Sequence, residues 1–231
     1  GDENFAPHER PPLSKEVLLG QAEKDSCLLW PPGTLEDAHI EMCLGVSVKS
    51  IDPDNHLLTL DSGKKVSWSK LLLATGGRAR SLDIEGIGLD GVYTLRTIED
   101  AERIRAGLTE GAKVLVIGAG WIGLEVAAAA RKRGASATVV EVADRVCARA
   151  LTADMSQWLH ALHERNGVDI RLETALSHFA GGHKLERALL KDGTSIDCDL
   201  AIIGIGLIPN TELAAGAGLH VDNGVVVDET A

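Results

Sequence analysis

The stretch that decides the fold is residues 114–141, which read VLVIGAGWIGLEVAAAARKRGASATVVE. Gly118 ends an apolar run and allows a sharp turn, Gly120 has no side chain to keep a phosphate from the backbone, and Gly123 allows a helix to pack closely on the strand. The alanine-rich segment that follows predicts a helix whose positive amino end faces the phosphates. The pattern therefore predicts a strand, a glycine turn and a helix that bind the diphosphate of a dinucleotide.

The second apolar run of this stretch ends in Glu141, near the spacing at which such domains place an acidic residue. A carboxylate there accepts hydrogen bonds from the ribose hydroxyls of NAD and repels the additional phosphate of NADP. Arg145 and Arg149 follow closely and could weaken that preference. The alternative interpretation is a plain glycine turn with Glu141 as a solvated charge at the strand end.

The composition of the chain is that of a globular α/β protein. Of its 231 residues, 45% are hydrophobic and 25% are charged, which is the ordinary mix of a domain with a packed core. The formal net charge of −11 argues against a nucleic-acid partner, because phosphate recognition needs a basic face. No apolar run approaches the roughly 20 residues that span a bilayer. Residues 1–12 do not resemble a signal peptide, so the cytoplasm is the expected location.

Strand and helix patterns alternate on both sides of the glycine turn, which is typical of a doubly wound parallel sheet. The expected strands are 113–117, 137–142, 168–172 and 199–204, and the expected helices are 97–109, 121–133 and 152–166. The helix over 97–109 begins with a threonine and acidic residues, which is a capping signature.

The flanking regions have other patterns. Alternating runs joined by the turns DPDN and DSGK predict an antiparallel meander over residues 46–68. The run KLLLATGG at 70–77 is continuously apolar before its glycines and predicts a strand buried on both faces. Short helices are expected over 11–20 and 211–217. The remaining expected strands are short ones within 175–196 and the segment GVVVD at 224–228.

Five ordered segments together resemble the FAD- and NADH-dependent ferredoxin reductases that serve bacterial aromatic-ring dioxygenases and some P450 systems. They are ERPPLSK at 9–15, LLLATGGRAR at 71–80, LRTIEDAERI at 95–104, VIGAGWIGLEVAA at 116–128 and GIGLIPNTELAAGAGLHVDNGVVVDE at 204–229. The resemblance implies an α/β fold with two Rossmann-like dinucleotide-binding domains and an antiparallel β-meander. It implies a partial FAD-binding domain over 1–95, a complete NAD-binding domain over 96–212, and a return into the FAD-binding domain over 213–231.

In the family a further glycine motif precedes the GDE that opens this chain, and a GD motif and a C-terminal domain come after the last segment. The chain is therefore expected to be a fragment that lacks part of its FAD site. The disulfide reductases that share this architecture need a paired cysteine near the flavin. None of the four cysteines lies in a CxxC or CxxxxC spacing, so that branch is disfavoured.

The resemblance also assigns site residues by motif position. Lys15 corresponds to a lysine beside the flavin ring and Glu125 to a glutamate facing the nicotinamide, so these two are the candidate catalytic residues and are expected to pair. The alternative for both is a solvated helix charge. The other candidate cofactor contacts are Arg10, Pro11, Val48, Ala74, Thr75, Gly76 and Arg96 for FAD, and Gly118, Gly120, Ile122, Gly123, Glu141, Arg149 and Gly206 for NADH. His8 departs from the family pattern, which has a tyrosine there. His160 and His163 are interpreted as helix-surface residues, so no metal site is expected.

The implied function is a flavoprotein oxidoreductase that passes electrons from NADH through FAD to a ferredoxin-type iron–sulfur protein of an aromatic-ring dioxygenase system, in aromatic hydrocarbon catabolism. One alternative is an NADH-binding module without turnover. The others are a rubredoxin reductase or an NADH oxidase of the same superfamily. The oligomeric state stays open, with a homodimer as one alternative.

Overall fold

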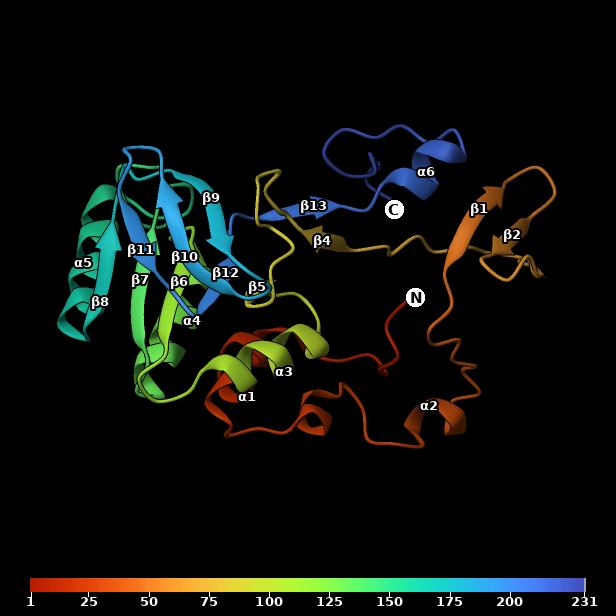
Figure 1. The fold of residues 1–231 in the computed structure, drawn as a ribbon. Coiled ribbons are helices and arrows are strands. Elements are labelled where there is room, and N and C mark those ends of the chain that lie inside the picture. Colours follow the sequence, from red (N-terminus) through yellow and green to blue (C-terminus); the bar gives the residue numbers. More distant parts are fainter. Residues whose placement is uncertain (231) are drawn as a thin grey trace. The chain divides into compact units, whose positions relative to one another are not determined.

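The computed structural model describes residues 1–230, and Figure 1 shows the order of their helices and strands. The chain folds into two compact units. The smaller unit contains residues 1–8, 28–78 and the segment from Leu207 onward, and the larger unit contains residues 9–27 and 79–206. Assignment of residues 1–95, 96–212 and 213–231 to domains by cofactor stays a prediction.

A five-stranded parallel sheet forms the centre of the larger unit (Figure 1). Its strand order is β5 (Val92–Thr94), β12 (Leu200–Ile203), β6 (Lys113–Ile117), β7 (Ser136–Val140) and β8 (Val168–Arg171). Every residue of β12 is buried, and so is every residue of β6 after the first. This burial on both faces explains why these strands are continuously apolar in sequence.

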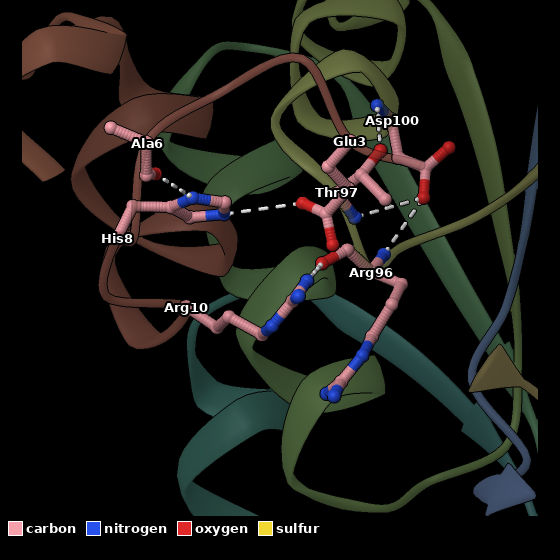
Figure 2. Close-up of polar contacts among 7 residues, drawn as sticks. All are labelled: Glu3, Ala6, His8, Arg10, Arg96, Thr97 and Asp100. Atoms are coloured by element: carbon pink, nitrogen blue, oxygen red, sulfur yellow. Dashed lines mark hydrogen bonds and ion pairs between the residues drawn. The ribbon is translucent and has the colours of Figure 1, made fainter. Parts of the chain in front are cut away.

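Helices cover one face of this sheet. They are α3 (Ile98–Gly107), α4 (Trp121–Lys132) and α5 (Ala153–Arg165), and α4 packs on β6, β7 and β12. The expected capping signature is confirmed at α3. The Thr97 hydroxyl accepts from the Asp100 backbone N–H at 3.2 Å, and the Asp100 carboxylate accepts from the Thr97 N–H at 3.0 Å (Figure 2).

The other face of the sheet is covered by an antiparallel sheet. Its strands are β9 (Leu176–Gly181), β10 (Leu185–Leu190) and β11 (Ser195–Asp197). Phe179 and Ala188 from this sheet join Leu115 and Ile203 from the parallel sheet in one buried apolar cluster. The short strands expected within 175–196 are therefore confirmed. Because they and not helices cover this face, the parallel sheet is not doubly wound.

The N-terminal part of the larger unit lies against the helices. It contains the 3₁₀ helix η1 (Pro11–Ser14), the short helix α1 (Glu16–Leu19) and the 3₁₀ helix η2 (Lys24–Cys27), and α1 contacts both α3 and α4. Gly20 ends α1 in the left-handed conformation, as the sequence pattern over 11–20 predicts.

The smaller unit contains the predicted meander of β1 (Val48–Asp52), β2 (Leu57–Leu60) and β3 (Lys65–Ser67), and adjacent strands in it run antiparallel. It also contains two short helices, α2 (Thr34–Asp37) and α6 (Glu212–Gly216). A two-stranded sheet joins β4 (Gly77–Ala79) to β13 (Leu207–Pro209).

Two strand predictions in this unit are wrong. Residues 70–76 form no strand, and the Leu72 side chain is 87% exposed. The segment GVVVD contributes only an isolated bridge between Val225 and Val221, and Val227 is 60% exposed. Both runs have the apolar composition of buried strands, but a buried strand needs paired neighbours, and no strand within residues 1–230 pairs with residues 70–76 or with the segment GVVVD.

Candidate dinucleotide site

The glycine turn between β6 and α4 is tightly packed at two of its three glycines. Gly118 has a φ of +102°, which favours glycine, and a Cβ on it would lie 2.6 Å from the Gly204 carbonyl oxygen. A Cβ on Gly123 would lie 2.0 Å from the Gly118 carbonyl oxygen. The protein's own packing therefore requires these two glycines.

Gly120 is different, because nothing within the described chain requires a glycine there. Its φ of −78° and ψ of −179° are open to any residue, and an added Cβ would meet only the Gly204 carbonyl oxygen, at 4.0 Å. Gly120 is the N-cap of α4, and no side chain within residues 1–230 caps that helix end. The space in front of Gly120 and the uncapped N–H groups of α4 fit an anion that approaches the backbone closely.

Glu141, one residue after β7, is fastened to this turn by both carboxylate oxygens. Its Oε2 accepts from the Ala119 backbone N–H at 2.7 Å, and its Oε1 accepts from the Ala143 N–H at 2.9 Å. Each oxygen has a further lone pair, so the carboxylate can still accept hydrogen bonds from a ligand. The Ala119 carbonyl in turn accepts from the Cys147 N–H at 2.9 Å. Cys147 has a φ of +48°, unusual for a residue other than glycine.

Two further candidate residues, Arg149 and Gly206, lie close together. A Cβ on Gly206 would lie 3.7 Å from the Arg149 guanidinium, and the Gly206 φ of +113° favours glycine. The Gly206 carbonyl accepts from the Arg80 N–H at 2.9 Å. The Arg149 side chain is exposed, so its cation is available to an anionic ligand.

Glu125, on the second turn of α4, makes the ion pair with Lys15 that the resemblance implies. The Lys15 ammonium lies 3.1 Å from Glu125 Oε1. The Ser14 hydroxyl donates to the other oxygen, Oε2, at 2.5 Å. Ser14 is buried with 6% of its surface exposed, whereas Ile122 on the preceding turn is 46% exposed. The sequence motifs do not point to Ser14, because a serine beside a lysine carries no signal of its own.

The residues expected to contact FAD fall into two groups. Arg10, Pro11, Lys15 and Arg96 belong to the larger unit, where the Arg10 guanidinium donates to the Arg96 carbonyl (Figure 2). Val48, Ala74, Thr75 and Gly76 belong to the smaller unit.

In the smaller unit, the Thr75 hydroxyl donates to the Asn210 carbonyl at 2.6 Å, and the Asn210 amide donates to the Thr75 carbonyl at 3.0 Å. The His8 side chain is 5% exposed, and it lies 3.6 Å from a Glu3 carboxylate oxygen (Figure 2). The position where the family has a tyrosine is therefore a buried polar residue here.

This site combines a glycine turn, an uncapped helix end and a carboxylate on the neighbouring strand, which together define a dinucleotide-binding protein. Comparison of the sequence with known protein families shows which family the chain belongs to. The model of the pyridine nucleotide-disulphide oxidoreductase family matches residues 1–231, and the chain belongs to this family.

Characterised relatives are similar over nearly the whole chain. Rhodocoxin reductase of Rhodococcus erythropolis is 42% identical over 99% of the chain and 54% of the relative. The ferredoxin–NAD(+) reductase subunit of the benzene 1,2-dioxygenase system of Pseudomonas putida is 40% identical over 99% and 55%. A crystal structure of the covalent putidaredoxin reductase–putidaredoxin complex matches with a TM-score of 0.96 at 41% identity, over 99% of this chain and 56% of that one. The chain therefore spans about half the length of the curated relatives it matches.

The α/β fold with a parallel sheet is thus confirmed, and the chain is similar to the ferredoxin reductases that the sequence motifs imply. Within residues 1–230, no helix is long and apolar enough to cross a membrane. The cofactor roles of the individual candidate residues stay predictions.

Proposed function

We propose that the chain is the nucleotide-binding part of an NADH-dependent, FAD-containing reductase that delivers electrons to a small iron–sulfur protein. The observation that carries this proposal is the corner at Gly120. Neither backbone conformation nor packing explains the glycine there, but close approach of a diphosphate to the uncapped amino end of α4 does.

In this proposal Glu141 selects NADH over NADPH. Its two oxygens are held by the Ala119 and Ala143 N–H groups, so the carboxylate is fixed before the ligand arrives. A fixed carboxylate accepts hydrogen bonds from both ribose hydroxyls, whereas it repels an additional phosphate. Arg149 lies beside Gly206 and contributes a cation for the diphosphate.

The nicotinamide end is placed by Lys15, which lies between η1 and α1, and by Glu125 of α4. Glu125 faces the carboxamide, and the Lys15 ammonium, 3.1 Å from Glu125 Oε1, puts a positive charge next to it. Lys15 is 44% exposed, so its ammonium has donors left for a second ring system beside the nicotinamide.

Bound FAD would supply the step that protein side chains cannot, which is to accept a hydride and release single electrons. The candidate residues for FAD within the larger unit are Arg10, Pro11, Lys15 and Arg96, and those within the smaller unit are Val48 and Ala74–Gly76. None of the four cysteines lies in a CxxC or CxxxxC spacing, which disfavours a disulfide reductase and favours an external acceptor.

The acceptor class follows from the relatives. One belongs by name to a benzene dioxygenase system, and another relative was crystallised with putidaredoxin. We infer that the partner is a ferredoxin-type protein and, more specifically, that this ferredoxin passes the electrons to an aromatic-ring dioxygenase. The names of the relatives are those of reductases, which does not favour an NADH-binding module without turnover.

The test is a spectroscopic titration without oxygen. The protein reconstituted with FAD should lose its visible flavin absorption when NADH is added, and oxidised ferredoxin should restore it. Oxidised rubredoxin and oxygen, added in parallel, identify the two other acceptors. NADH binding without any loss of flavin absorption would show a binding module, and equal responses to NADH and NADPH would remove Glu141 from its role.

A further inference from the structure

We propose that Ser14 is a positioning residue that fixes the Glu125 carboxylate and so orients the nicotinamide end of the dinucleotide. This inference rests on the proposed function. The sequence motifs assign no role to Ser14, and its hydrogen bond to Glu125 is distinct from the ion pair that Lys15 makes with the same carboxylate.

The ion pair alone cannot fix the carboxylate. Lys15 is a long side chain with 44% exposure, and Glu125 is 29% exposed, so their attraction is screened by water and leaves both chains free to rotate. Ser14, in contrast, is 6% exposed and has a single side-chain torsion before its hydroxyl. Its place at the end of η1 is held by the backbone, since the adjacent Lys15 N–H donates to the Pro12 carbonyl at 3.1 Å.

The hydroxyl proton of Ser14 has two acceptors within reach. Glu125 Oε2 lies 2.5 Å from the hydroxyl oxygen, and the Pro11 carbonyl lies 3.3 Å from it. The shorter contact, which is to a charged oxygen, takes the proton, because charge-assisted hydrogen bonds are the stronger ones. Ser14 and Lys15 therefore present one donor to each oxygen of the same carboxylate. Two donors on two oxygens fix the plane of the group, which one ammonium on one oxygen does not.

The two ends of the dinucleotide depend on different residues. The diphosphate and adenosine side meets Gly120 and Glu141, neither of which contacts Ser14. The nicotinamide side meets Glu125, one turn further along α4. Loss of the Ser14 hydroxyl should thus affect a ligand that carries nicotinamide and leave a ligand without it unaffected. A residue with a merely structural role would weaken both ligands alike.

The experiment compares NAD⁺ with ADP-ribose, which lacks only the nicotinamide, by isothermal titration calorimetry on the full chain. For Ser14→Ala we expect the Kd of NAD⁺ to rise roughly five- to tenfold, the size of one ordinary hydrogen bond, with the Kd of ADP-ribose within about twofold of the unsubstituted protein. Ser14→Thr keeps the hydroxyl and should recover most of the NAD⁺ affinity. In a Glu125→Ala background, which removes the acceptor of the Ser14 hydroxyl, Ser14→Ala should have no additional effect on the ratio of the two Kd values.

Ser26→Ala is the matched control. Ser26 also lies in a 3₁₀ helix, and its hydroxyl donates to a carbonyl three residues back, that of Glu23, at 2.6 Å, but to no carboxylate. It should change neither Kd. An equal rise of both Kd values in Ser14→Ala, or no rise in either, would overturn the inference while leaving the proposed function intact. If the unsubstituted protein bound neither ligand, the proposed function itself would be wrong.

Discussion

Gly123→Ala should mainly lower the stability of the fold, whereas Gly120→Ala should mainly weaken NADH binding. The two glycines are nevertheless only three residues apart in one motif. At Gly123 an added Cβ would lie 2.0 Å from the Gly118 carbonyl oxygen and 3.1 Å from a Val116 methyl. Real Cβ atoms stay beyond 3.0 Å of such neighbours, so α4 has to move away from the turn. At Gly120 the only neighbour is the Gly204 carbonyl oxygen, at 4.0 Å, so nothing has to move.

The magnitudes follow from these contacts. Overpacking a tight site costs about 1–3 kcal/mol, and displacement of a rigid helix by backbone contact belongs at the upper end. The higher helix propensity of alanine returns about 1 kcal/mol. Gly123→Ala should therefore lower the free energy of unfolding by about 2 kcal/mol. Gly120→Ala exchanges a permissive N-cap for a poorer one and should cost less than about 1 kcal/mol.

The affinity for NADH should be affected most by the substitution at Gly120. A methyl group at position 120 fills the space that a diphosphate would use, so Gly120→Ala should raise the Kd of NADH about tenfold or more, which is about 1.4 kcal/mol. Urea unfolding gives the stability, and calorimetric titration with NADH gives the affinity. Gly182→Ala is the control, because its Cβ would meet nothing within 4 Å and it lies in the turn after β9. Unchanged NADH affinity in Gly120→Ala would refute the argument that this glycine makes room for the ligand.

Three further predictions concern the carboxylate, a buried thiol and a helix cap. Glu141→Ala should weaken NADH binding by about 1–3 kcal/mol and narrow the preference over NADPH, measured against Asp144→Ala, whose side chain is 72% exposed on the same loop. Burial, with two neighbouring aspartates, raises the pKa of the Cys198 thiol from 9.0 to about 12. Above pH 9 the folded protein keeps a proton on this thiol that the unfolded chain loses. The contribution of Cys198 to the free energy of unfolding is therefore fully present below pH 9. It falls by about 1.4 kcal/mol per pH unit between pH 9 and about pH 12. Thermal unfolding between pH 8 and pH 11 checks this, and Cys198→Ala should flatten the slope. Thr97→Ala should destabilise the protein by about 1 kcal/mol in urea unfolding, because it removes the hydroxyl that accepts from the Asp100 N–H.

The larger unit could be predicted well from the sequence because its signals are local. The capping box at Thr97, the glycine turn and the two-sided apolar strands each determine their own structure over a few residues. The ion pair of Lys15 with Glu125 could be found only through the resemblance, since the two lie far apart in sequence and no periodicity connects them.

The failures have a common physical cause, which is that burial depends on partners. The run at 70–77 and the segment GVVVD have the right composition for buried strands, yet Leu72 is 87% exposed and Val227 is 60% exposed. The composition of a segment does not indicate whether a neighbouring strand is present to pair with it. Ser14 was missed for the same reason, because its importance comes from the carboxylate it contacts and not from its own position in a motif.

The corner at residues 118–123 is stiff because several elements converge on it. The Gly204 N–H, after β12, donates to the Ile117 carbonyl at 2.8 Å, and the Gly204 carbonyl is what a Cβ on Gly118 would strike. Glu141 ties the same turn to β7 through the Ala119 N–H. Because the turn is fixed by β12 and β7 as well as by its own helix, a ligand meets a preformed surface and little ordering cost is left to the binding step. A substitution that loosens Gly204 should therefore weaken binding even though it leaves every proposed direct ligand contact in place.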